Sequence, residues 1–310
     1  SWNSMNDTGA AIQLSSILLL IVAFLFFIEK YFNKDKRFSF PKNSQLIILN
    51  NACKLKKILI YFICITTIVL AFIIPVLFNL VNIFSNFNKI DLESLGILTF
   101  NSFGISLFAS LLILMLSTFF LFNEKMSKSK VYYYINQFIS LGYSIPGAVV
   151  ALAIIISVIS IDNLNDSNNL LGGNFVYYVI LIYAYIIRFM AVGKSPIKSS
   201  LEKYPEVYDK SAKNLGLSNF KIFQKIYFPI NKYAFFTALT LVFIDLMKEL
   251  PITLILSPFD FDTLATQTYE YAIEEMISMS AIYSSAIILI CSILLIFLKF
   301  FLDKSNVFKS

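Results

Sequence analysis

Seven long runs of apolar residues, separated by polar segments, dominate the pattern of this chain. They cover residues 10–28, 58–80, 98–122, 136–160, 175–192, 233–256 and 280–302. Each run is close to the roughly 20 residues that a helix needs to cross about 30 Å of hydrocarbon. Because a backbone in lipid must satisfy its own hydrogen bonds, we expect each run to be a helix. The pattern predicts an all-α polytopic membrane protein with about seven transmembrane helices in the lipid bilayer.

The composition agrees with a membrane protein and argues against catalytic and metal-binding sites. The 310 residues are 58% hydrophobic, with a mean hydropathy of +0.75, which is too apolar for an ordinary soluble domain. The chain has no His, and its three Cys are scattered without the spacing of a zinc site or a disulfide framework. It also lacks a nucleophile–base pattern and a glycine-rich phosphate loop. We therefore predict no catalytic residue, no metal site and no cofactor in this chain.

Basic residues indicate how the chain is oriented in the membrane. The segments 29–57, 123–135 and 193–232 and the C-terminal end hold 22 of the 25 Lys and Arg residues. The alternate loops hold Lys89 beside several Asp and Glu residues. Because positive loops stay in the cytoplasm, the N-terminus is predicted outside and the C-terminus in the cytoplasm. The net charge of +6 follows from this topology and gives no reason to expect a nucleic acid partner.

The polar segment 29–57 divides the chain into two unequal parts. It is basic, contains Pro41 and separates the first apolar run from the other six. We predict a lone transmembrane helix in 1–28 and a cytoplasmic linker over 29–57. A six-helix unit over 58–302 and a cytoplasmic tail over 303–310 follow.

The longest polar stretch between two apolar runs, residues 204–230, is predicted to form a helical hairpin. Gly216 suits the left-handed residue that ends a helix. Ser218 or Asn219 can cap a second helix, which Pro229 is expected to stop. We call residues 204–230 the Gly216 hairpin.

Three residues of the first helix of the Gly216 hairpin are predicted to share one face. Val207, Ser211 and Leu215 are four residues apart and therefore share one face of a helix. A short capped hairpin of this kind has the form of a docking element. The alternative is an ordinary connector that only links two spans.

The spacing within this hairpin resembles the EAA loop of ABC-transporter permeases. That pattern is Glu-Ala-Ala, three residues, Gly, nine residues, Ile, one residue and Leu-Pro. Four positions match it: Ala212, Gly216, Ile226 and Pro229. Lys210, Ser211 and Phe228 stand at the positions of the Glu, the first Ala and the Leu. The helix–glycine–helix form is independent of these departures.

The resemblance implies a role in coupling to ATP hydrolysis. In the family this loop sits in a groove of a separate cytoplasmic ATPase subunit, which binds the ATP, and carries its motion to the membrane helices. We therefore expect the loop 194–232 to be a coupling loop. The residues implied in coupling are Lys210, Ser211, Ala212, Gly216, Ile226 and Pro229.

Pro146 and Gly147 interrupt the fourth apolar run. A proline removes a helix hydrogen bond and kinks the helix, and a glycine lets another backbone approach. The kink has two interpretations: a packing feature, or a bend that lines a translocation pathway.

Asp245, Lys248 and Glu249 lie within the sixth apolar run, before Pro251. Their spacing of three and four residues would place all three on one face of a continuous helix. A charge at the centre of the membrane costs at least about 2.5 kcal/mol, so such residues normally face a cavity or a partner. The alternatives are a self-neutralising patch near the outer surface and a lining of the translocation pathway.

The segments 247–254, 258–266 and 269–272 resemble the end of iron(III) ABC permeases, and 142–151 resembles an equivalent stretch of the same family. This resemblance implies an inner-membrane permease for ferric iron. It would work with a periplasmic binding protein and a second permease half, which is an upstream segment, a separate chain or a second copy. Permeases for thiamine, phosphonates, sulfate and polyamines share the loop and remain alternatives.

The chain begins with Ser1-Trp2, which favours a C-terminal part of a longer two-module permease, although Met5 is a possible internal start. A rival interpretation is a secondary transporter that uses the charges of the sixth run for ion coupling, with the Gly216 hairpin as a connector. A membrane scaffold would leave those charges unexplained. Arg188, in the fifth run, is expected only to snorkel or pair.

Overall fold

The computed structural model describes residues 54–86, 90–127, 129–164, 173–203 and 207–307, together with residue 88 and a few positions between 13 and 28. The predicted lone helix in 1–28 and most of the predicted linker 29–57 lie outside the described residues. Over the described part, every regular element is a helix. The all-α prediction is therefore confirmed.

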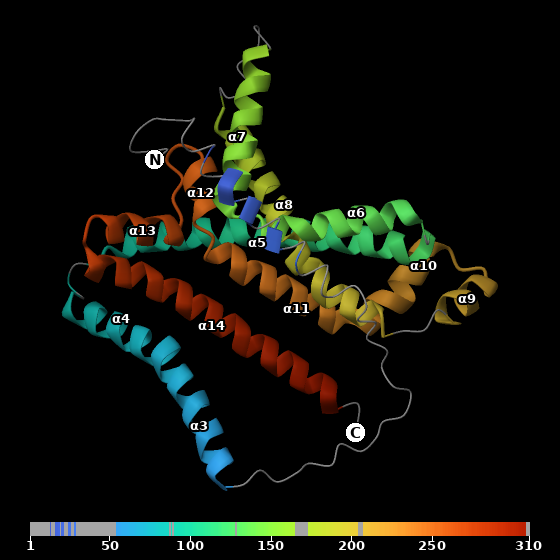
Figure 1. The fold of residues 1–310 in the computed structure, drawn as a ribbon, viewed down its shortest axis with the longest axis horizontal. Coiled ribbons are helices and arrows are strands. Elements are labelled where there is room, and N and C mark those ends of the chain that lie inside the picture. The colour runs from blue at the N-terminus through green and yellow to red at the C-terminus, as the bar shows by residue number, and fades with distance from the viewer. Residues whose placement is uncertain are drawn as a thin grey trace.

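Within the described residues, five helices are long and apolar enough to cross a membrane. Figure 1 shows how they are arranged. Two of them contain a π-helical turn. The first consists of α3 (Lys54–Ile68), the π turn η1 (Val69–Ile73) and α4 (Ile74–Ser85). The second consists of α10 (Asn219–Ile222), the π turn η4 (Phe223–Tyr227) and α11 (Phe228–Met247). The others are α5 (Leu92–Ser127), α8 (Asn174–Leu201) and α14 (Ile277–Val307). The pair α6 (Lys130–Leu141) and α7 (Gly147–Leu164) makes a sixth span if counted as one.

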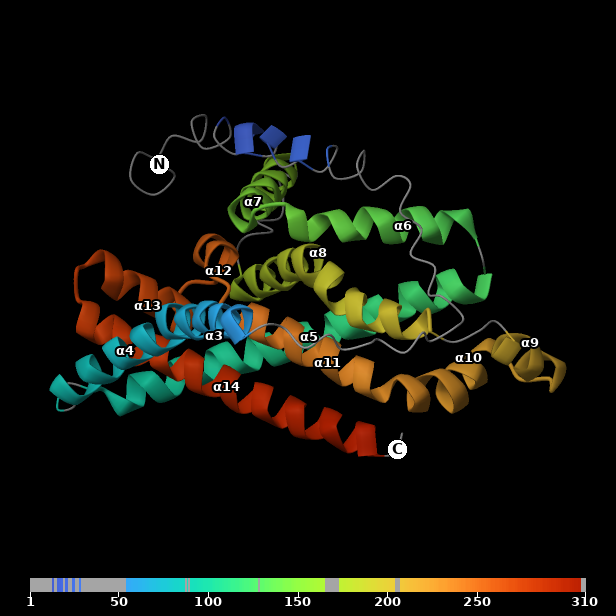
Figure 2. The same ribbon diagram turned by 60° about the horizontal axis from the view of Figure 1, so that its bottom comes forward.

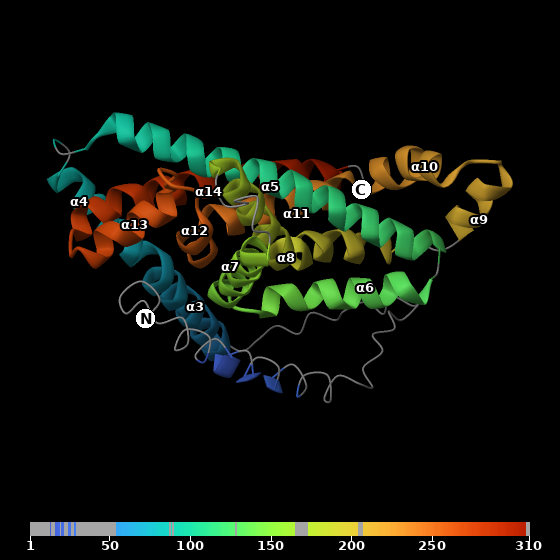
Figure 3. The ribbon, with the colours of Figure 1, turned by 90° about the horizontal axis from the view of Figure 1, so that it is seen from above.

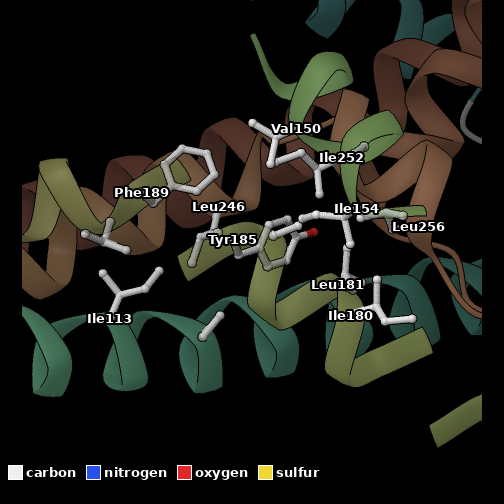
Figure 4. Packing of buried hydrophobic residues seen from close by; sticks show 14 of the residues in the cluster. Ile113, Val150, Ile154, Ile180, Leu181, Tyr185, Phe189, Leu246, Ile252 and Leu256 are labelled. Atoms are coloured by element: carbon white, nitrogen blue, oxygen red, sulfur yellow. The ribbon is translucent and has the colours of Figure 1, made fainter. Parts of the chain in front are cut away.

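The helices α5, α8 and α11 form the centre of the molecule. Small residues among the larger ones at their contacts let these helices approach closely. A side-chain carbon added to Gly193 of α8 would lie 3.1 Å from Ile113 and 3.3 Å from Val242. The buried serines of α5 are Ser102, Ser106, Ser110 and Ser117. Figure 4 shows Tyr185 of α8 in the largest cluster, with Leu181, Ile154 and Leu246 around it.

The helix formed by α3, η1 and α4 is the least covered part of the described chain. None of its residues is buried, and α14 is its main neighbour, through α4. Figure 2 shows α4 and α14 side by side. This helix therefore leaves nearly all of its apolar side chains for lipid or for another chain.

The fourth predicted span, 136–160, is not one kinked helix. It is two helices, and the direction of the chain bends by 110° between them. The residue before Pro146, Ile145, is extended, with φ −82° and ψ 129°, because a proline disfavours the helical conformation of its predecessor. The 3₁₀ turn η3 (Gly142–Ser144) ends the first helix, and α7 then rises away from α5, α11 and α14 (Figure 1).

The sixth predicted span, 233–256, ends early for a similar reason. The helix stops at Met247, four residues before Pro251, where the proline ring would collide with the helical carbonyl. A separate short helix, α12 (Pro251–Leu256), follows. The prediction that Pro229 stops a helix is wrong, however. The π turn η4 before Pro229 opens the backbone, and the helix continues to Met247.

Candidate functional site

The Gly216 hairpin has the predicted helix–glycine–helix form. The first helix, α9 (Val207–Asn214), ends at Gly216, whose φ is +76°. The Leu217 N–H donates to the Ala212 carbonyl at 3.2 Å and the Gly216 N–H donates to the Lys213 carbonyl at 2.9 Å, which is a Schellman motif. The Ser218 hydroxyl accepts from the Lys221 N–H and caps α10, as predicted.

Ala212 fixes the hairpin to the rest of the protein. It is buried in a cluster that also contains Leu121, Ile197, Leu201, Ile222 and Tyr227. Lys125 of α5 donates to the Leu201 carbonyl at 2.8 Å and lies 4.7 Å from the centre of the Tyr227 ring. On the face predicted to hold Val207, Ser211 and Leu215, Ser211 and Leu215 are exposed, and the side chain of Val207 lies outside the described residues.

Two large apolar side chains remain uncovered at the hairpin turn. Leu215 is 79% exposed and Phe220 is 67% exposed. The hairpin lies at the far end of α5 and α8, opposite α13 (Leu264–Ile273), as Figure 3 shows. Among the other residues implied in coupling, Ile226 is half-buried and Pro229 is exposed within the continuous helix. The side chain of Lys210 lies outside the described residues.

The break at Pro146 places Gly147 against two charged side chains. A side-chain carbon at Gly147 would overlap the Arg188 guanidinium and lie 2.7 Å from Glu249 Oε1. Arg188 Nη1 donates to that same oxygen at 3.2 Å. The three residues come from α7, α8 and the turn between α11 and α12. We call them the Gly147–Arg188–Glu249 clamp.

Glu249 is the buried member of this clamp. Its side chain is 7% exposed, and its Oε1 also accepts from the Ile252 N–H at 3.3 Å, so it caps α12. Thr253 donates to the Glu249 carbonyl at 3.0 Å and shares a hydrogen bond of 2.6 Å with the Tyr185 hydroxyl. The sequence predicted that Arg188 would snorkel or pair but did not identify Glu249 as its partner.

Asp245 and Lys248 form a separate pair. Lys248 Nζ lies 2.9 Å from Asp245 Oδ1, and the Lys248 side chain is 62% exposed. The prediction that Glu249 shares their face is wrong because the helix ends at Met247 and the following turn directs Glu249 to Arg188.

A second buried charge, not identified from the sequence, joins α5, α6 and α8. Lys194 of α8 donates to the Asn136 carbonyl and, at 2.7 Å, to the Ser140 hydroxyl. The Asn136 amide donates to Glu124 Oε2 at 2.5 Å and to the Phe120 carbonyl at 3.2 Å. This network fastens α6, which has few other buried side chains, to the centre of the molecule.

Acidic residues gather at the opposite end of the molecule, around α13. Burial, together with the nearby Asp262 and Glu274 carboxylates, raises the pKa of Glu270. Within the described residues, no three His, Cys, Asp or Glu side chains lie close enough to hold a metal ion.

Comparison with known sequences places this arrangement in context. The family described as binding-protein-dependent transport system inner membrane component matches residues 121–306. The Fe(3+)-transport system permease protein FbpB 2 of Haemophilus influenzae is 27% identical over 199 residues. That alignment covers 64% of this chain and 38% of the Haemophilus protein, so this chain spans well under half of that relative.

A solved structure has a similar fold. It is the bacterial alginate ABC transporter in complex with alginate pentasaccharide-bound periplasmic protein, and one of its chains superposes with a TM-score of 0.62. The match covers 79% of this chain and 93% of that chain, at 14% sequence identity. The helix arrangement described above is therefore shared with a chain of a known transporter.

Proposed function

Because this chain belongs to the family of binding-protein-dependent transport system inner membrane components, we propose that it is a permease subunit of an ATP-driven importer. One observation carries the proposal. The Gly216 hairpin is held on the helices by Ala212, while Leu215 and Phe220 stay exposed at its turn. An apolar pair on a rigid support is a suitable anchor for a groove in another protein. That other protein is a cytoplasmic ATPase subunit, which binds the ATP.

The charges of the two ends support an orientation. The hairpin end is basic and the α13 end is acidic, as expected if the hairpin is in the cytoplasm and α13 faces the periplasm. The N-terminus is then outside and the C-terminus inside. A periplasmic binding protein delivers the substrate at the α13 end. A second permease half completes the pathway, and this chain itself catalyses no reaction.

Ferric iron is the proposed substrate. The support comes from the segments 247–254, 258–266 and 269–272, which resemble the end of iron(III) permeases, and from a relative that is named for Fe(3+) transport. In the structure these segments form the turn with Glu249, the helix α12 and the capped helix α13. They lie at the end where the substrate would enter.

Uptake of radioactive ferric iron tests the proposal. In cells that lack the gene, the wild-type chain should restore uptake that requires both the binding protein and ATP. Replacing both anchors, Leu215→Glu with Phe220→Glu, should lower uptake about tenfold or more, because losing an interface anchor costs about 2 kcal/mol. The amount of the chain in the membrane fraction should not change, since both side chains are exposed.

The control variant is Lys299→Gln, which changes an exposed residue of α14 outside the coupling loop and should transport normally. Uptake that survives ATP depletion and the anchor variant would instead support a secondary transporter. Uptake of thiamine, phosphonate, sulfate or polyamine without iron would replace the substrate and leave the permease role in place.

A further inference from the structure

A polar cavity of about 360 Å³ lies where α6, α8 and α11 meet. Figures 2 and 3 show α8 between α6 and α11. The cavity is lined on its apolar side by Ala191, Val192, Pro196 and Leu241. Its polar side consists of Ser140, Tyr143, Ser144, Ser195 and Asp245. The Gly147–Arg188–Glu249 clamp is not part of this lining.

Every polar side chain of this cavity presents oxygen. Four are hydroxyls and one is a carboxylate. Oxygen ligands of this kind suit hard cations, whereas nitrogen and sulfur ligands suit softer ones. The chemistry of the lining thus favours a small, highly charged cation over an apolar or aromatic solute.

Two of these side chains are held in place by neighbours. The Tyr143 ring packs edge-on against Phe189, with ring centres 6.2 Å apart. Asp245 is held by Lys248, which approaches from the exposed side. Ser140, also in the lining, accepts a hydrogen bond from the buried Lys194. A cation in the cavity would therefore lie near two lysine ammonium groups, those of Lys248 and Lys194, which opposes tight retention.

We propose that this cavity is a transit site for ferric ion, with the Tyr143 phenol oxygen and the Asp245 carboxylate as its ligands. The proposal rests on the proposed function. A ferric ion that carries hydroxide takes the phenolate of Tyr143, and the phenol proton passes to that hydroxide and leaves as water. The serine hydroxyls hydrogen-bond to the water that the ion retains. Two anionic ligands beside two lysines make a site that binds briefly and releases.

Transport by the complete complex in proteoliposomes, supplied with iron-loaded binding protein, tests the site. Tyr143→Phe and Asp245→Asn should each lower the iron taken up per ATP hydrolysed by about tenfold, the usual effect of losing a hydrogen bond or ligand to a charged group. ATP hydrolysis stimulated by the binding protein should stay within about twofold of wild type, since neither residue lies in the Gly216 hairpin. That measurement also shows that the variants fold and assemble.

Two further variants separate a ligand from a structural role. Tyr183→Phe removes a hydroxyl from an exposed tyrosine of α8 outside the cavity and should transport as wild type does. Lys248→Gln breaks the same ion pair as Asp245→Asn but keeps the carboxylate, so its uptake should fall less. Equal losses in Lys248→Gln and Asp245→Asn, or normal uptake in Tyr143→Phe, would overturn the transit site while iron transport stands. A wild-type complex that moves no iron would overturn the site and the proposed substrate together.

Discussion

Glycine is required at two positions in this protein, Gly216 in the hairpin and Gly147 at the helix break, for opposite reasons. Gly216 has a φ of +76° and open space around the position of a side-chain carbon. Gly147 sits in the first turn of α7 without positive φ, but Arg188 and Glu249 occupy the space that a side chain would need. The first position therefore requires glycine for its backbone and the second for its lack of a side chain.

The conformation at Gly216 is determined by residues close in sequence, whereas the need for glycine at position 147 comes from residues in other helices. A helix that ends in a left-handed residue is set by its own few residues, so the sequence around Gly216 is enough to predict it. Gly147 is fixed by Arg188 and Glu249, which are 41 and 102 residues further along the chain. The hairpin should consequently respond to local substitutions, whereas the bend should respond to changes in residues distant in sequence.

The largest loss of stability is expected when only one of the two charges in the clamp is removed. Arg188→Gln or Glu249→Gln leaves the other charge buried without its partner, which costs about 3–5 kcal/mol. The double variant Arg188→Gln with Glu249→Gln should recover part of that loss because no unpaired charge remains. Arg188→Lys should fail to restore stability, since a lysine cannot reproduce the guanidinium geometry. The measurement is the free energy of unfolding in mixed micelles.

The pair Asp245–Lys248, in which Lys248 is largely exposed and Asp245 is not, is the matched control for the clamp. Lys248→Gln should change the free energy of unfolding by at most about 1 kcal/mol, because Lys248 is largely exposed. If Arg188→Gln proves as mild as Lys248→Gln, the clamp is not what holds the bend.

Alanine and asparagine, each placed at both glycines, test this difference between the two positions. At Gly147, alanine should cost about 1–3 kcal/mol by overpacking, and the larger asparagine should cost more. At Gly216, alanine should cost about 1 kcal/mol, and asparagine should cost less because it tolerates the left-handed conformation. The order of alanine and asparagine should therefore reverse between the two sites in the same unfolding experiment. The same order at both sites would contradict the distinction drawn here.

The sequence predicted what depends on neighbouring residues. The apolar runs over α5, α8 and α14, the Gly216 turn and the Ser218 cap follow from residues a few positions apart. It predicted an interruption at Pro146, but it missed the helix end before Pro251 and wrongly expected Pro229 to stop a helix that continues there after a π turn. Nor did it predict the partner of Glu249, because Arg188 lies in another helix. Both outcomes are decided by packing between helices.

The smallest expected effect concerns the cap of the second hairpin helix, and it tests whether the Gly216 hairpin is locally determined. Ser218→Ala removes the acceptor for the Lys221 N–H and should cost about 1 kcal/mol. Since α10 continues into α11, the loss should stay at the hairpin, so amide hydrogen exchange of α10 should speed up about fivefold. Ser218→Asp should restore the slow exchange, because aspartate caps a helix as well as serine. Exchange that also speeds up in α8 would mean that the cap supports the helix bundle itself, and that the hairpin is no more local than the bend.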